Sequence, residues 1–264
     1  MTQQDRSTRH DEPVSPKDRF ITVYGRNPVH EVLLDDDLHV DKVVVAEGTR
    51  GAGIREIEQA ARRRGVPVQR ASADRVKKLA GNGRQDQGVL ADVVAPRMRP
   101  LDAALDADAD ASALGSVLVL DGITTPANVG MILRSATAAG VGGVVVPRRG
   151  VASLDPLVVK ASAGVAFKAP ILKTATAEEA VAALKTRGFH VVGLDASGDD
   201  DLFAAHLREP VAFVLGSETA GLSPEVARLV DTWVSIPMAS GVESLNVSAA
   251  AAVVCFELVR RSRL

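Results

Sequence analysis

Five polar residues from the middle of the chain onward are the strongest candidates for chemistry. Asn128 and Arg134 come first, Glu218 stands in a glycine-rich stretch, and Ser244 and Asn246 come last. Each group follows an apolar run typical of a buried strand. Ligands of parallel α/β sheets bind beyond the carboxyl ends of the strands, so these positions predict a ligand site. Within such a site a guanidinium can stabilise a developing anion, although it is too weak a base to take a proton.

Each group also has a purely structural interpretation. Asn128 is placed to cap a helix over residues 129–139, which leaves Arg134 as a surface arginine on another side of that helix. The stretch from Leu215 to Leu222 fits an ordinary strand, turn and helix start. Its two glycines would also let the backbone approach a ligand closely.

The third group begins at Ile236-Pro237-Met238 and leads to a helix expected over residues 247–261, which is apolar nearly all round until Arg260. The small polar residues before this helix predict either capping by Asn246 or Ser248, or contact with a ligand. A helix of this composition must be buried, in the core or in a subunit interface.

From residue 116 onward, expected strands and helices alternate. The strands are continuous apolar runs, which favours a parallel sheet covered on both faces. They are residues 117–120, 143–146, 190–194, 212–215 and 233–236, and the helices are residues 129–139, 156–162, 177–187, 224–229 and 247–261. The sequence therefore predicts an α/β domain over residues 116–264.

The rest of the chain divides into three parts. Residues 1–19 are polar and charged and predict a disordered tail, residues 20–96 predict a small α/β domain, and the Ala/Asp-rich residues 97–115 predict a linker. In the small domain the expected strands are residues 40–46, 66–69 and 88–95, and the expected helices are residues 28–34, 55–64 and 73–80.

The net charge of -2 gives no sign of a nucleic-acid partner, but the charge is unevenly distributed. Residues 55–84 hold nine Lys and Arg against three acids, and a phosphate contact needs local positive charge. This stretch is either an RNA-binding surface or a solvated basic helix face. The candidates for RNA contact are Arg26, Arg62, Arg63, Arg64, Lys77, Lys78 and Arg84.

The composition argues against a membrane protein or a secreted one. No apolar run approaches the roughly 18 residues of a membrane span, and residues 1–19 contain no apolar signal segment. The single cysteine, Cys255, lies in an apolar run, which predicts a buried, unreactive thiol. One cysteine also fits a reducing compartment, so we expect a cytoplasmic protein, and we expect no metal.

Together and in this order, the three groups resemble the motifs of the TrmH (SpoU) family of SPOUT-class RNA 2′-O-methyltransferases. The first is an Asn-x-Gly helix start with Arg134 six residues after Asn128, the second is Leu-Gly-x-Glu-x-x-Gly-Leu, and the third is Ile-Pro-Met followed by Ser-Leu-Asn-Val-Ser. Residues 160–164 (Lys-Ala-Ser-Ala-Gly) match a further stretch. Thr219 departs from the small residue that the family carries after the glutamate.

The resemblance covers residues 116–264 and implies a parallel α/β domain whose deep trefoil knot forms a pocket for S-adenosylmethionine. It implies methyl transfer to a ribose 2′-hydroxyl of RNA, and a homodimer through this domain with the active site at the interface. Arg134 would hold an RNA phosphate and stabilise the oxyanion. The catalytic residues that it implies are Asn128, Arg134, Glu218, Ser244 and Asn246, and the cofactor-binding residues are Leu215, Gly216, Ser217, Gly221, Ile236, Met238 and Leu245.

Residues 24–29 and 86–89 resemble the two ends of the ribosomal-protein-like RNA-binding domain of the RlmB-type ribosomal guanosine methyltransferases. This resemblance implies a guanosine of 23S ribosomal RNA as the target, with transfer RNA as the alternative. A non-catalytic ribosome-binding or assembly factor is a rival, but the motif residues are all present. A nucleotide-binding oxidoreductase is disfavoured, because the glycines of residues 140–143 follow an expected helix and precede a strand, the reverse of the Rossmann order.

Overall fold

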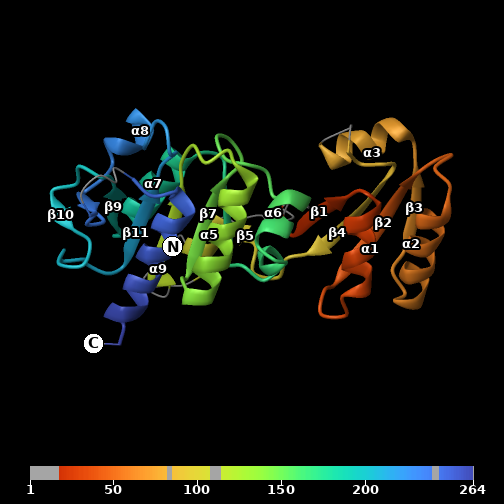
Figure 1. The fold of residues 1–264 in the computed structure, drawn as a ribbon, viewed down its shortest axis with the longest axis horizontal. Coiled ribbons are helices and arrows are strands. Elements are labelled where there is room, and N and C mark those ends of the chain that lie inside the picture. The colour runs from red at the N-terminus through yellow and green to blue at the C-terminus, as the bar shows by residue number, and fades with distance from the viewer. Residues whose placement is uncertain (1–17, 82–84, 108–113, 240–243, 264) are drawn as a thin grey trace, which may run out of the picture.

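The computed structural model describes residues 18–81, 85–107, 114–239 and 244–263. The chain forms two α/β lobes that lie side by side (Figure 1). The N-terminal lobe holds a four-stranded sheet and the C-terminal lobe an eight-stranded sheet. Among the described helices, none has the length and apolar character that a membrane crossing requires.

The N-terminal lobe packs helices on both faces of a mixed sheet with the strand order β1-β4-β2-β3. Val43 and Val45 of the second strand pack with Ile57 on one face, whereas Val44 packs with Val76 on the other. Helices α1 and α2 therefore cover one face and α3 covers the opposite one. The elements are β1 (Phe20–Tyr24), α1 (Arg26–Leu34), β2 (Val40–Ala46), α2 (Ala52–Arg63), β3 (Val68–Ala71), α3 (Ala73–Ala80) and β4 (Val89–Val94).

This lobe has one strand more than the sequence predicts. β1 pairs antiparallel with β4 from Phe20 opposite Val94 to Tyr24 opposite Leu90. Its five residues show only a short alternation of buried and half-buried positions, and the pairing with β4 is what makes them a strand. β2 and α3 have the predicted bounds.

The C-terminal lobe is a parallel sheet in the order β10-β12-β9-β11-β6-β7-β8-β5, and its neighbouring strands all run parallel. This confirms the predicted fold class. Its strands are β5 (Arg99–Pro100), β6 (Ser116–Leu120), β7 (Gly143–Pro147), β8 (Ile171–Thr174), β9 (His190–Leu194), β10 (Asp200–Asp201), β11 (Val211–Leu215) and β12 (Thr232–Ser235). Its helices are α4 (Leu101–Ala107), α5 (Pro126–Ala139), α6 (Pro156–Ala161), α7 (Ala177–Thr186), α8 (Pro224–Ala227) and α9 (Val247–Arg261).

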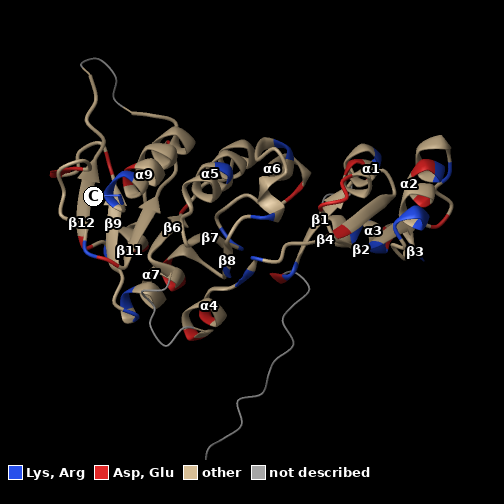
Figure 2. Cartoon of the chain, turned by 90° about the horizontal axis from the view of Figure 1, so that it is seen from below, with Lys and Arg blue, Asp and Glu red and all other residues tan. Residues whose placement is uncertain are grey.

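Helices cover both faces of this sheet. Leu118 packs on one side in a cluster with Ile132 of α5 and Val254 of α9, whereas Val119 packs on the other with Val181 of α7. Figure 2 shows α5 and α9 on one side of the strands and α4 and α7 on the other. This two-sided burial explains why the strands are continuous apolar runs.

Part of the stretch that we expected to be a linker is regular structure. β5 pairs with β8, and the sequence predicted neither strand. α4 buries Leu101 and Leu105 in the core on the α7 side of the sheet. The Ala/Asp-rich composition gave no sign of this helix, because Leu101 and Leu105 are its only large apolar residues. Residues 108–113 of the stretch lie outside the described residues.

Side chains connect the two lobes at their junction. Tyr24 Oη donates to Asp155 Oδ2 at 3.4 Å, and Asp155 in turn accepts from the backbone N of Leu157 at 2.9 Å and caps α6. Arg148 forms an ion pair with Asp18. The end of β1 therefore lies beside the start of α6, on the side of the large sheet where its strands end.

Candidate active site

Three of the predicted catalytic residues form one hydrogen-bond network where β11, α5 and α9 meet. Glu218 Oε1 accepts from Asn128 Nδ2 at 2.9 Å, from Asn246 Nδ2, and from the backbone N of Val247 at 3.3 Å. Asn246 Nδ2 also lies 3.1 Å from Asn128 Oδ1. One carboxylate oxygen thus holds the start of α5 and the start of α9 together.

Asn128 does not cap its helix, contrary to the structural interpretation of the sequence. α5 begins at Pro126, so Thr125 occupies the N-cap position and Asn128 lies within the first turn, buried and directed at Glu218. Asn246 does cap α9, because its Oδ1 accepts from the backbone N of Ser248 at 2.9 Å. Its side chain therefore caps the helix with the oxygen and reaches Glu218 with the nitrogen.

The loop between β11 and α8 is closed on itself. Ser217 N donates to Gly221 O at 3.0 Å, and Gly221 N donates back to Ser217 O at 2.9 Å. A Cβ placed at Gly216 would lie 2.3 Å from the carbonyl carbon of Gly221, so a side chain at 216 has no room. Asp121 steadies the far end of the loop by accepting from Ser223 N at 2.6 Å.

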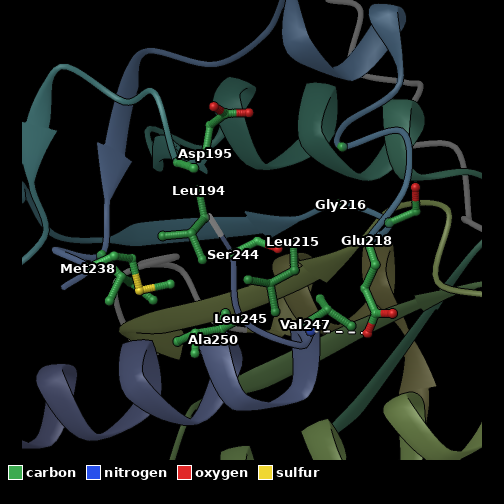
Figure 3. A pocket seen from close by; sticks show the side chains of 14 residues that line it. Leu194, Asp195, Leu215, Gly216, Glu218, Met238, Ser244, Leu245, Val247 and Ala250 are labelled. Atoms are coloured by element: carbon green, nitrogen blue, oxygen red, sulfur yellow. Dashed lines mark hydrogen bonds between the residues drawn. The ribbon is translucent and has the colours of Figure 1, made fainter. Parts of the chain in front are cut away.

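A pocket of about 250 Å³ lies between this loop and the segments before α9 (Figure 3). Its walls consist of backbone from turns as well as apolar side chains, and Glu218 lies at one end of the pocket. The sequence missed the contribution of β9, although the carboxyl-end rule applies to that strand as well. The lining residues are Leu194, Asp195, Ala196, Leu215, Gly216, Ser217, Glu218, Gly221, Ile236, Met238, Ser244, Leu245, Val247 and Ala250, which include the seven predicted cofactor-binding residues.

A second, more polar pocket of about 230 Å³ adjoins the first at the start of α5. Thr124, Thr125 and Asn128 line it, and Glu218 and Val247 line both pockets. The carboxylate network therefore stands between an apolar pocket and a polar one. Such an arrangement suits two reactants that must meet at a single point.

Arg134 stands apart from the other four candidates. Its side chain is exposed on α5, six residues beyond Asn128, which is about 9 Å along the helix. It lines neither pocket. Its neighbour one turn back, Met131, is 39% exposed and accepts a contact from Ser248 Oγ at 3.8 Å. Arg134 thus lies on the solvent-exposed side of α5, outside both pockets.

Two family profiles match almost the whole described chain. The SpoU rRNA Methylase family matches residues 115–256, and the profile described as RNA 2'-O ribose methyltransferase substrate binding matches residues 22–99. The chain belongs to the SpoU rRNA methylase family. It is an RNA 2′-O-ribose methyltransferase, and the resemblance seen in the sequence motifs is confirmed.

Relatives of this family match both lobes. The chain is 35% identical over 242 residues to the 23S rRNA (guanosine-2'-O-)-methyltransferase RlmB of Xylella fastidiosa, covering 92% of this chain and 97% of that protein. Among solved structures it is similar to the SpoU methyltransferase AviRb of Streptomyces viridochromogenes in complex with AdoMet, at 29% identity and a TM-score of 0.61, with 92% and 90% of the two chains covered. It is also similar to an AdoMet-bound rRNA methyltransferase from Sinorhizobium meliloti, at 25% identity and a TM-score of 0.62, with 93% and 88% covered.

The predicted RNA-contact residues of this SpoU methylase do not form one surface. Arg62 and Arg63 are exposed at the last turn of α2, whereas Lys77 and Lys78 are exposed on α3, across the sheet (Figure 2). Arg26 lies at the start of α1. A basic stretch that is continuous in sequence is thus divided by the sheet between them.

Arg64 has a structural function in the N-terminal lobe. Its guanidinium donates to the backbone carbonyls of Val32 at 3.0 Å and Asp35 at 2.8 Å, and also to that of Leu38. It therefore ties the connection between α1 and β2 to the end of α2. Arg84, also predicted to contact RNA, lies outside the described residues.

Cys255 is buried in α9, as the sequence predicts. Burial raises the pKa of its thiol to about 12, which keeps it protonated at neutral pH. A protonated thiol is a poor nucleophile, so Cys255 has a packing role and lies outside the network of the SpoU motifs.

Proposed function

We propose that the chain transfers a methyl group from S-adenosylmethionine to the ribose 2′-hydroxyl of a guanosine in 23S ribosomal RNA. The observation that carries the proposal is the Glu218 network between an apolar and a polar pocket. The named target of the RlmB relative, which matches both lobes, supports the choice of RNA. In this proposal residues 20–96 bind the RNA, and residues 116–264 catalyse the methyl transfer.

The apolar pocket fits the methyl donor. Leu194, Leu215 and Ile236 offer apolar walls for an adenine ring, while the closed turn at Gly216 presents main-chain groups at close range. The donor supplies an electrophilic methyl group on a positively charged sulfur. The carboxylate of Glu218 at the end of the pocket favours this positive charge. We include in the proposal the trefoil knot that the resemblance implies, since the chain segments around residues 216, 236 and 245 meet at this pocket.

The polar pocket would receive the ribose. Thr124 and Thr125 offer hydroxyl groups there, and Asn128 is held in one orientation by Glu218. A bound 2′-hydroxyl would thereby face the donor pocket across the network. The 2′-oxygen would attack the methyl carbon as the carbon–sulfur bond of the donor breaks, and S-adenosylhomocysteine would leave. The hydroxyl proton would pass to an RNA phosphate oxygen or to water, and Arg134 would stabilise the negative charge that develops on the oxygen. Ser244 lines the donor pocket and completes the catalytic set.

The active form is a homodimer through the C-terminal lobe. α5 exposes Met131, and α9 exposes Phe256, which is 54% exposed. Exposed apolar side chains on packed helices favour a protein partner. Arg134 is exposed on α5 as well, and dimerisation over this helix would enclose it beside the reaction centre. The enzyme would act in the cytoplasm.

The experiment incubates the purified protein and methyl-labelled S-adenosylmethionine with 23S ribosomal RNA or with total transfer RNA. Nucleoside mass spectrometry of the digests should show 2′-O-methylguanosine in the 23S sample only. Methylation of transfer RNA alone would establish the alternative substrate. Binding to 23S RNA without methylation in either sample would favour a non-catalytic ribosome-binding factor.

A further inference from the structure

Three arginines gather where β2 passes into α2. Arg50 and Arg55 are exposed around the turn at Gly51 and Gly53. Arg26 reaches the same turn from the start of α1: its Cδ lies 3.5 Å from a Cβ placed at Gly53, and its Nη1 lies 3.8 Å from one placed at Gly51. We call these three side chains the arginine edge.

Within the described ranges no carboxylate pairs with the arginine edge, since the ion pairs there involve other basic residues. The Nε of Arg26 is buried and has no hydrogen-bond partner among the described residues. α2 starts with Gly51 as N-cap, with no capping side chain and no acid in its first turn. Unpaired guanidinium groups beside free backbone N–H groups favour an anion, and phosphate above all.

The arginine edge lies on the same side of the molecule as the methyl-transfer site. Tyr24, two residues before Arg26, donates to Asp155 at the start of α6. In the loop before α6, Ala152 N donates to Ile123 O at 3.0 Å, and Ile123 lines the polar pocket. A series of direct contacts thus leads from the arginine edge to the pocket proposed for the ribose.

The other basic groups of the lobe lie elsewhere. Arg62 and Arg63 are at the opposite end of α2, a helix of 12 residues, which is about 18 Å long. Lys77 and Lys78 are on the opposite face of the sheet. An RNA strand that runs between the N-terminal lobe and the polar pocket would therefore pass the arginine edge rather than these other basic groups.

We propose that Arg26, Arg50 and Arg55 bind backbone phosphates of the RNA whose ribose enters the polar pocket. This inference rests on the proposed function and adds to it the surface of the N-terminal lobe that aligns the substrate. Arg50 lies outside the basic stretch that the sequence indicated, and Arg55 belongs to that stretch but was not among the residues named for RNA contact. The glycine-rich turn and its arginines become a unit only when α1 brings Arg26 beside them.

The test compares two double variants of the full chain with equal loss of charge. Arg50→Ala with Arg55→Ala removes two of the three side chains of the arginine edge, and Arg62→Ala with Arg63→Ala changes the other end of the same helix. Binding of a 23S ribosomal RNA transcript is measured at several salt concentrations. The first variant should lose about 2 from the slope of log K against log salt, and the second should lose about 0.

Steady-state methylation supplies the second measurement. The arginine-edge variant should raise the KM for RNA by about tenfold, while kcat at saturating RNA and the affinity for S-adenosylmethionine stay at wild-type values. All four side chains are exposed, so both variants should melt at the wild-type temperature. Equal salt slopes for the two variants, or a larger loss in the Arg62 and Arg63 variant, would overturn the inference. Absence of 23S methylation by the wild-type protein would refute the proposed function, and the binding comparison, repeated with transfer RNA, would still decide the arginine edge.

Discussion

Replacing Gly216 by alanine tests whether the loop between β11 and α8 forms the donor pocket. A Cβ at this position would lie 2.3 Å from Gly221 C, 2.5 Å from Gly221 O and 2.6 Å from Leu222 N. These are backbone atoms, and the hydrogen bonds between Ser217 and Gly221 hold them in place. No side-chain rotation can relieve the contact, so the turn itself must open.

Overpacking of this kind costs about 1–3 kcal/mol. The turn lines the pocket, so we expect the cost to fall on the bound state and to weaken S-adenosylmethionine binding by about 5-fold to 150-fold. Gly221→Ala is the matched control in the same turn. It has open space around the added Cβ but a φ of +65°, and a left-handed backbone costs an alanine about 1 kcal/mol, so its loss should be close to 5-fold.

Isothermal titration calorimetry with S-adenosylmethionine measures both variants, and a thermal melt shows that each is folded. The order of affinity should be wild type, then Gly221→Ala, then Gly216→Ala. A folded Gly216→Ala protein that binds S-adenosylmethionine as tightly as the wild type would refute the assignment of this turn to the donor pocket.

Four further outcomes are expected. Arg134→Ala should slow single-turnover methyl transfer at saturating RNA by about 100-fold to 1000-fold, and Arg134→Lys should restore little of the lost rate. Calorimetry should show unchanged S-adenosylmethionine affinity for both variants, and a near-normal rate for Arg134→Ala would make Arg134 a surface residue. Glu218→Ala removes the acceptor of three hydrogen bonds and should reduce both donor affinity and rate, with unaltered values of both contradicting the network. Cys255, whose pKa burial raises to about 12, should resist alkylation at pH 8 in the native protein and react after denaturation; rapid native labelling would contradict its burial. A hydrogen bond from Arg260 holds the pKa of Glu257 below its usual value, so the carboxylate stabilises the fold above the unfolded-state pKa of about 4.3 and ceases to do so as the pH falls through the lower folded-state pKa. Glu257→Gln should therefore lower the melting temperature by a few degrees at pH 7, about 1–2 kcal/mol, and by progressively less below pH 4; a difference independent of pH would argue against the ion pair.

Elements with a strong local pattern could be predicted from the sequence. β2, α3, β9 and α9 have the expected bounds, because apolar runs, a capping serine or a long apolar helix define them without help from the rest of the chain. β8 was missed because it is a strand of four residues that only its neighbours in the sheet define.

The candidate site was predictable in membership and less so in geometry. Motif resemblance brought Glu218 and Asn246 into one site, but the capping role expected of Asn128 was wrong, because α5 starts three residues earlier than the pattern suggests. The RNA surface was the hardest to predict. Charge counted along residues 55–84 takes no account of the sheet that separates α2 from α3.

The most direct test of the central claim is mass spectrometry of 23S ribosomal RNA from cells with and without the gene. The proposal predicts one 2′-O-methylguanosine that disappears on deletion, returns with the wild-type gene and stays absent with the Arg134→Ala gene, while transfer RNA is unchanged. An identical set of ribose methylations in 23S RNA from both strains would contradict it.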